Sequence, residues 1–182
     1  MSRIALPTAD QTPAATLPLL AAVQKQLGVV PNLMKTLGHS PAALEGYLSL
    51  MGALGKGSIG AKTGERVALA VAEFNRCGYC LSAHSYLGTQ VAKLDEAEIA
   101  ANRMGRSSDA KATAAVHFAL QVAKARGHVA DADVQAVKAA GFSDGEVMEL
   151  VGQVALNVLT NYVNSVAQTE VDFPAVIPHA TA

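Results

Sequence analysis

The residues best suited to chemistry lie close together near the middle of the chain. Cys77 and Cys80, the two cysteines of the sequence, form a Cys-x-x-Cys motif, and His84 follows the second cysteine by four residues. Two thiols at this spacing can form and break a disulfide within one helical turn, and an imidazole can transfer the proton that the reaction moves. A disulfide across so short a loop removes little entropy from the unfolded chain. The motif therefore favours redox chemistry over a stabilising role.

The segments around the motif are predicted to be helical. Residues 75–78, Asn-Arg-Cys-Gly, indicate a break between a helix over about 62–75 and a helix that carries 80–87. Cys77 would then lie at a helix start, where free backbone N–H groups and the helix dipole favour the thiolate. Cys77, Cys80 and His84 can share one face of that helix.

Two carboxylates precede the motif. Glu65 and Glu73 flank an otherwise apolar segment, where an ionised side chain costs free energy unless it is paired or used. We expect one of the two to serve the cysteines. The alternative is a solvated charge at a helix end, and it fits Glu65 best because Gly64 precedes it.

Metal binding is the main alternative to redox chemistry for a Cys-x-x-Cys motif. A structural zinc site needs four ligands. Beyond Cys77, Cys80 and His84, the sequence offers no second cysteine pair and no paired histidines at ligand spacing. The sequence thus predicts no metal, and a metal-binding or purely structural helical oligomer is the weakest alternative.

The whole chain is predicted to be all-α. Strand patterns are absent, whereas cap residues precede apolar-periodic segments repeatedly: Ser40 before Pro41, Asp95, Ser108 or Asp109, Asp131, and Ser143. We expect a single domain over residues 1–182. Its N-terminal arm, 1–30, would contain a short helix at about 19–27, and its tail, 172–182, would be extended and would either pack on a neighbour or fray.

Composition limits the partners and the location. The formal net charge of -1 gives no footprint for nucleic acid or an anionic membrane. The most apolar stretch, 147–166, contains Glu149 and several amides, which a lipid-facing span does not tolerate. An N-terminus interrupted by prolines does not resemble a secretory signal, so we expect a cytoplasmic protein. Apolar content of 51% with only 4% aromatic residues suits helix packing and a homo-oligomer.

A second polar pattern lies near the C-terminus. Shifting the sequence by 84 positions places Glu149 on Glu65, and Asn161 and Asn164 on the two cysteines, which suggests two similar helical halves. Asn157, Asn161 and Asn164 also form a stripe at helical spacing. This stripe could line a pocket, form hydrogen bonds across a subunit interface, or face solvent.

The window from Glu65 to His84 resembles the alkylhydroperoxidase D and carboxymuconolactone decarboxylase superfamily, and most of all its peroxidase-related subgroup. Members of that subgroup tend to have an acidic residue twelve positions before the Cys-x-x-Cys and a histidine four after it. Softer matches at 32–34, at 143–146 and at 172–174 extend the resemblance over most of the chain. The resemblance implies an all-helical fold assembled into trimers or hexamers, and thiol-dependent reduction of hydroperoxides.

The resemblance also assigns roles to single residues. Cys80 matches the peroxidatic cysteine, Cys77 its resolving partner, His84 the relay histidine and Glu65 the distal carboxylate of the proton relay. Tyr79 departs from the best-studied branch, which has a second histidine there. A phenol, with an ordinary pKa of about 10, does not shuttle protons near neutrality, although it can hold a water or donate a hydrogen bond.

These roles imply a reaction that needs no bound cofactor. Cys80 would attack the peroxide and form a sulfenic acid, Cys77 would condense with it, and an external dithiol of the lipoyl or thioredoxin-like type would reduce the disulfide. The alternative is a non-enzymatic redox sensor or a general dithiol/disulfide oxidoreductase. A measurement of catalytic turnover distinguishes the peroxidase from these alternatives.

Overall fold

A computed structural model describes residues 2–180, and these residues form helices and no strand. A 3-10 turn, Ala14–Thr16, precedes nine α-helices. The helices are α1 (Leu17–Leu27), α2 (Asn32–Leu37), α3 (Pro41–Leu54), α4 (Gly60–Phe74), α5 (Gly78–Gln90), α6 (Glu96–Arg103), α7 (Ala110–Ala125), α8 (Asp131–Ala139) and α9 (Asp144–Ala167). The all-α prediction is therefore confirmed.

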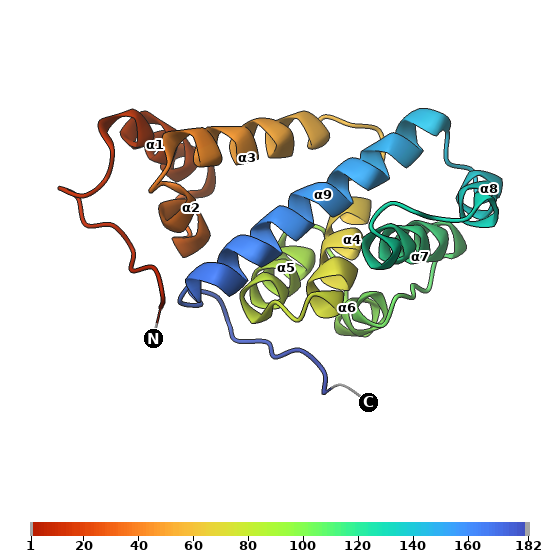
Figure 1. Cartoon of the computed structure of the whole chain (residues 1–182). Coiled ribbons are helices and arrows are strands. Elements are labelled where there is room, and N and C mark those ends of the chain that lie inside the picture. Colours follow the sequence, from red (N-terminus) through yellow and green to blue (C-terminus); the bar gives the residue numbers. More distant parts are fainter. Residues whose placement is uncertain (1, 181–182) are drawn as a thin grey trace.

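Helix α4 is the centre of the fold. It packs against α5, α6, α7 and α9 (Figure 1), and its run from Val67 to Ala72 is at most 2% exposed. Val67 and Val71 belong to one hydrophobic cluster, shared with α7 and α9, while Ala72 belongs to a second cluster that contains both cysteines. The apolar segment between the two predicted carboxylates is thus the core of the molecule.

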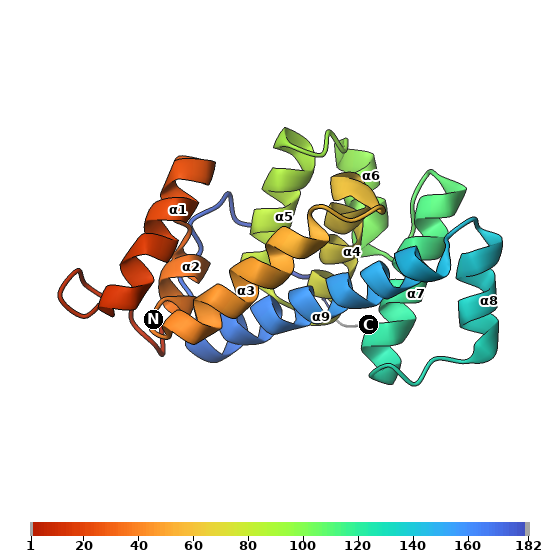
Figure 2. The same cartoon turned by 90° about the horizontal axis from the view of Figure 1, so that it is seen from above.

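Helix α9 is the longest of the described helices, and it lies with α3 on one side and α4 and α5 on the other (Figures 1 and 2). The expectation of two similar halves fails in the predicted register. Residues 65–84 form parts of two helices with a break between them, whereas 149–167 lie within the single continuous helix α9. The 84-residue shift therefore does not superimpose equivalent elements.

The predicted helix starts are largely right, because side-chain caps determine them. Ser40, Asp95, Asp109 and Ser143 each accept a hydrogen bond from the backbone N–H three residues later. Asp131 is instead the first residue of α8, one position after its N-cap. Helix α2 has no counterpart in the sequence prediction, since six residues are too few to show helical periodicity.

The first and last described segments of the chain both contact the body of the molecule. The N–H groups of Arg3 and Ile4 donate to the carbonyl of Ala167 at the end of α9, and α1 begins two residues before the predicted helix. We call residues 170–180 the C-terminal strap. This segment is extended, as predicted for the tail, and it packs on its own chain rather than fraying; residues 181–182 of the predicted tail lie outside the described residues. Within residues 2–180, none of the helices combines the length and the apolar character that a bilayer span needs.

Candidate functional site

The break before α5 positions the two cysteines. Helix α4 ends in a Schellman motif, in which the N–H of Cys77 donates to the carbonyl of Ala72 at 2.9 Å and the N–H of Arg76 donates to that of Glu73 at 3.0 Å. Arg76 adopts a left-handed φ of 55°, which is uncommon for a residue with a side chain. The chain turns sharply at this point, and Cys77 becomes the N-cap of α5.

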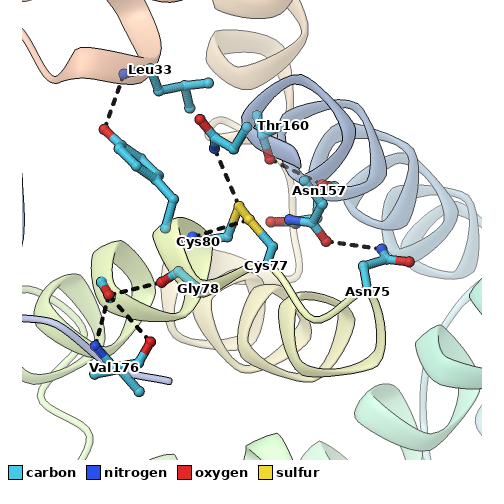
Figure 3. Close-up of a disulfide and its surroundings, with 12 residues drawn as sticks. Leu33, Asn75, Cys77, Gly78, Cys80, Asn157, Thr160 and Val176 are labelled. Atoms are coloured by element: carbon cyan, nitrogen blue, oxygen red, sulfur yellow. Dashed lines mark hydrogen bonds between the residues drawn. A yellow bond between two sulfur atoms is a disulfide. The ribbon is translucent and has the colours of Figure 1, made fainter. Parts of the chain in front are cut away.

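Cys77 and Cys80 form a disulfide at the N-terminus of α5 (Figure 3). The Sγ of Cys77 also accepts the backbone N–H of Cys80 at 3.2 Å, which is the contact of a capping side chain. The predicted position of the first cysteine at a helix start is therefore confirmed. Each cysteine is only 2% exposed, within an apolar cluster that includes Leu33 and Tyr47.

His84 pairs with Glu65, as the predicted relay requires. The imidazole Nδ1 lies 2.8 Å from the Oε2 of Glu65, and the two side chains are 22% and 21% exposed. A carboxylate accepts, so Nδ1 carries the hydrogen and the other ring nitrogen is left as the basic atom of a neutral imidazole. His84 lies one helical turn beyond Cys80 along α5, and Glu65 reaches it from α4.

Glu73 has a different set of partners. Its carboxylate accepts from Nε of Arg103 at 2.6 Å and from the backbone N–H of His179 in the C-terminal strap at 2.7 Å. Arg103 also donates to the carbonyl of Ile177. Glu73 therefore fastens the strap to the end of α4, and of the two predicted carboxylates only Glu65 pairs with His84.

The Tyr79 hydroxyl bonds to the strap and to α2. It donates to Oδ1 of Asp172 in the strap at 2.8 Å and accepts the backbone N–H of Leu33 at 3.0 Å. Burial raises the pKa of Tyr79 far above its ordinary value. The hydrogen bond from the Leu33 N–H lowers this pKa, and Asp172 raises it further. The phenol joins α2, α5 and the strap, which is the hydrogen-bonding role that the sequence left open for it.

The strap contacts α5 at a second point. Ser82 donates to the carbonyl of Gly78 and accepts the backbone N–H of Val176 at 2.9 Å (Figure 3). Together with the Tyr79 contact, this bond holds the strap along the first two turns of α5. The cysteines therefore lie in a region that α2 and the C-terminal strap both contact.

The asparagine stripe of α9 faces the cysteines. Asn157, Asn161 and Asn164 are 4%, 0% and 4% exposed, which excludes the solvated face among the three alternatives. Asn164 donates from Nδ2 to Sγ of Cys80 at 3.4 Å, and Asn161 accepts from the amide of Asn75 at 2.9 Å. The sequence signal for this contact was the helical spacing of the amides.

Tyr47 of α3 is a residue of the site that the sequence analysis missed. It is 8% exposed and packs in the same apolar cluster as the cysteines. Burial and then the charge of Glu65 raise the pKa of Tyr47 to about 12, so Tyr47 brings a neutral hydroxyl to this region. A tyrosine in a predicted amphipathic helix carries no signal that distinguishes this position from ordinary core packing.

Metal binding has no geometric support in the described part of the chain. No group of three or more histidine, cysteine, aspartate or glutamate side chains within residues 2–180 is arranged to hold an ion.

Comparisons with known proteins agree with this architecture. Residues 41–125 match the carboxymuconolactone decarboxylase family. A peroxidase-related protein from Ralstonia eutropha JMP134, described as an alkylhydroperoxidase AhpD core, superimposes with a TM-score of 0.83 at 26% identity, over 94% of this chain and 92% of that chain. A peroxidase-related protein from Silicibacter sp. TM1040 superimposes with a TM-score of 0.81 at 24% identity, over 93% and 91%.

A third solved structure shares the fold alone. The debrominase Bmp8 superimposes with a TM-score of 0.77 at 17% identity, over 94% of each chain. No curated protein matches the sequence. The family match spans the region from α3 to α7, which contains both cysteines, His84 and Glu65, and the structural matches extend over almost the whole chain. This chain therefore matches the carboxymuconolactone decarboxylase family over residues 41–125 and has the AhpD-like fold.

Proposed function

We propose that this protein is a thiol-dependent peroxidase that reduces hydroperoxides at Cys80 and is regenerated by an external dithiol. The observation that carries the proposal is a Cys77–Cys80 disulfide at a helix N-terminus, with His84 one turn further along the same helix and paired with Glu65 of α4. The likeness to a peroxidase-related AhpD core at 26% identity supports the same chemistry.

The first step forms a sulfenic acid. His84 accepts the proton of the Cys80 thiol, and the charge of Glu65 stabilises the imidazolium that results. The thiolate attacks the terminal oxygen of R–O–OH, so an S–O bond forms and the O–O bond breaks. Sulfur loses two electrons, and the leaving alkoxide takes the proton from His84 and departs as an alcohol.

The second step closes the disulfide. The Cys77 thiol attacks the sulfenic acid of Cys80, and water leaves. A dithiol then reduces the disulfide by thiol–disulfide exchange, which restores both thiols and leaves the donor oxidised. The chemistry suits a lipoyl-type or a thioredoxin-like donor, because each supplies two thiols that can close their own ring or disulfide.

The test is steady-state reduction of tert-butyl hydroperoxide by the purified protein with dihydrolipoamide or thioredoxin as the donor. We expect turnover in the wild type and its loss in Cys80→Ser and in Cys77→Ser. Ser82→Ala is a matched control, since Ser82 lies on the same helix and bonds only to Gly78 and to the strap. Turnover that persists in Cys80→Ser would refute the assignment.

The alternative of a redox sensor predicts a different kinetic pattern. A sensor forms the Cys77–Cys80 disulfide once and then does not turn over with any dithiol donor. If the protein consumes one equivalent of peroxide in a single burst and shows no steady state with either donor, it is a sensor or a general oxidoreductase and not a peroxidase.

A further inference from the structure

The environment of Cys80 differs from that of Cys77 in one respect. Both sulfurs are buried and both lie at the start of α5, but Cys77 Sγ accepts a backbone N–H, that of Cys80, whereas Cys80 Sγ accepts from a side-chain amide, the Nδ2 of Asn164. When the disulfide is reduced and Cys80 ionises, this contact becomes a charge-assisted hydrogen bond, which is roughly twice as strong as a neutral one. The amide therefore favours ionisation of Cys80.

Two polar atoms beside this contact are buried and have no partner. They are the Oδ1 of Asn164 and the Nδ2 of Asn161, one acceptor and one donor on the same face of α9. Asn161 is held in place by the amide of Asn75, which donates to its Oδ1 at 2.9 Å. Buried polar groups are normally satisfied, so an unpaired donor and an unpaired acceptor near a reactive sulfur indicate a polar ligand.

We propose that Asn161 and Asn164 form an amide site at Cys80, in which Asn164 stabilises the thiolate and the two unpaired amide atoms hold the O–O–H group of the hydroperoxide. The peroxide O–H donates to Asn164 Oδ1, and a peroxide oxygen accepts from Asn161 Nδ2. The substrate half of this inference rests on the proposed peroxidase function, whereas the thiolate half does not.

The test of the thiolate half uses charge-neutral substitutions. The titratable side chains around the site are Cys77 and Tyr79 of the same turn, Tyr47 of α3, Asp172 of the strap, His84 further along α5, and Glu65 of α4, which pairs with His84. Asn161 and Asn164 do not titrate, so their replacement by leucine changes no charge. Asn157 supplies the control, because it is equally buried on the same helix and its amide bonds only to the carbonyl of Gln153.

The first measurement is the pH dependence of Cys80 alkylation by iodoacetamide in the Cys77→Ser background, where Cys80 is the sole thiol. We expect Asn164→Leu to raise the measured thiol pKa by about one to two units, the equivalent of one hydrogen bond to a charged group. Asn157→Leu should leave it within about 0.3 units, the scatter expected of a buried substitution that leaves the sulfur contact intact. Asn164→Ala provides a smaller substitution if leucine disturbs the fold. An unchanged thiol pKa in both Asn164 variants would overturn the thiolate half.

The second measurement tests the substrate half. It is the second-order rate constant for oxidation of Cys80 by tert-butyl hydroperoxide, taken at a pH where the thiolate is fully formed. Asn161→Leu should lower this constant about tenfold, the effect of one lost hydrogen bond, while Asn157→Leu changes it less than twofold. Equal constants for wild type and Asn161→Leu would show that the unpaired atoms hold only an ordered water. If the wild type does not react with the hydroperoxide, the peroxidase function fails, and the thiol pKa still decides the role of Asn164.

Discussion

Replacement of Tyr79 by phenylalanine separates a positioning role from a proton-transfer role at the residue between the two cysteines. The substitution removes one hydrogen bond to the carboxylate of Asp172 and one from the buried N–H of Leu33. Asp172 is exposed and keeps its bond from the N–H of Asn32 at 2.8 Å, so its carboxylate can be rehydrated. The N–H of Leu33 has no such replacement, because Leu33 is 8% exposed.

The expected cost follows from these contacts. A hydrogen bond to a charged group contributes about 1.5–3 kcal/mol and an ordinary one about 1 kcal/mol, and exposure of Asp172 reduces the first. We expect Tyr79→Phe to lower the free energy of unfolding by about 2 kcal/mol, which corresponds to about 4–8 °C in Tm for a chain of this size.

Urea unfolding of the oxidised protein, followed by circular dichroism, measures this loss. Tyr86→Phe is the matched control, since Tyr86 is 45% exposed and its ring contacts Phe173; it should change the free energy by less than about 0.5 kcal/mol. If Tyr79 only positions α5 and the strap, the pH profile of Cys80 alkylation stays unchanged in Tyr79→Phe. A stable variant whose pH profile shifts would refute the positioning role and restore Tyr79 to the relay.

Three further predictions concern carboxylates. Burial alone would raise the pKa of Glu98, but hydrogen bonds from Ser107, Ser108 and Asn102 lower it from 4.5 to about 2. A carboxyl group whose pKa is lower in the folded state than in the unfolded state stabilises the fold above its unfolded pKa, and this stabilisation is lost as the pH falls. We therefore expect up to about 3 kcal/mol of the free energy of unfolding to be lost between pH 5 and 2. Glu98→Gln should remove that acid slope in urea titrations at several pH values, and an identical slope would contradict this account. Glu149 accepts hydrogen bonds from two backbone N–H groups at the start of α4, at 2.7 and 3.0 Å. Glu149→Gln should therefore lower the free energy of unfolding by about 1 kcal/mol, measured by thermal unfolding. An unchanged Tm would contradict this capping role. Glu65→Gln should slow peroxide reduction about tenfold or more in stopped-flow assays without loss of helicity, and a rate equal to wild type would remove Glu65 from the relay.

Local sequence patterns were enough to predict the helices with strong caps. Ser40, Asp95, Asp109 and Ser143 accept hydrogen bonds from residues three positions away, so the information that starts each helix is contained in a few consecutive residues. Helix α2 was missed because it is short and is held by tertiary contacts, including the bond from Leu33 to Tyr79. The prediction of two similar halves from the 84-residue shift was wrong in that register, because polar residues spaced by chance in a long helix can resemble a repeat.

The sequence by itself determined the all-α class, the pairing of two cysteines at a helix start and the candidate relay of His84 with an acidic residue. The helical class and the cysteine pairing depend on spacing within short segments, and local backbone geometry converts such spacing directly into proximity, whereas the relay came from the resemblance to a family. Only the tertiary structure decided that Glu65 of α4 pairs with His84 of α5 while Glu73 holds the strap, and that the Tyr79 hydroxyl bonds to the strap and to α2. It also decided that Asn164 reaches Cys80 from 84 residues away. Those contacts depend on how α9 and the strap pack over α4 and α5, and the sequence periodicity of one helix does not specify which neighbour its polar face will meet.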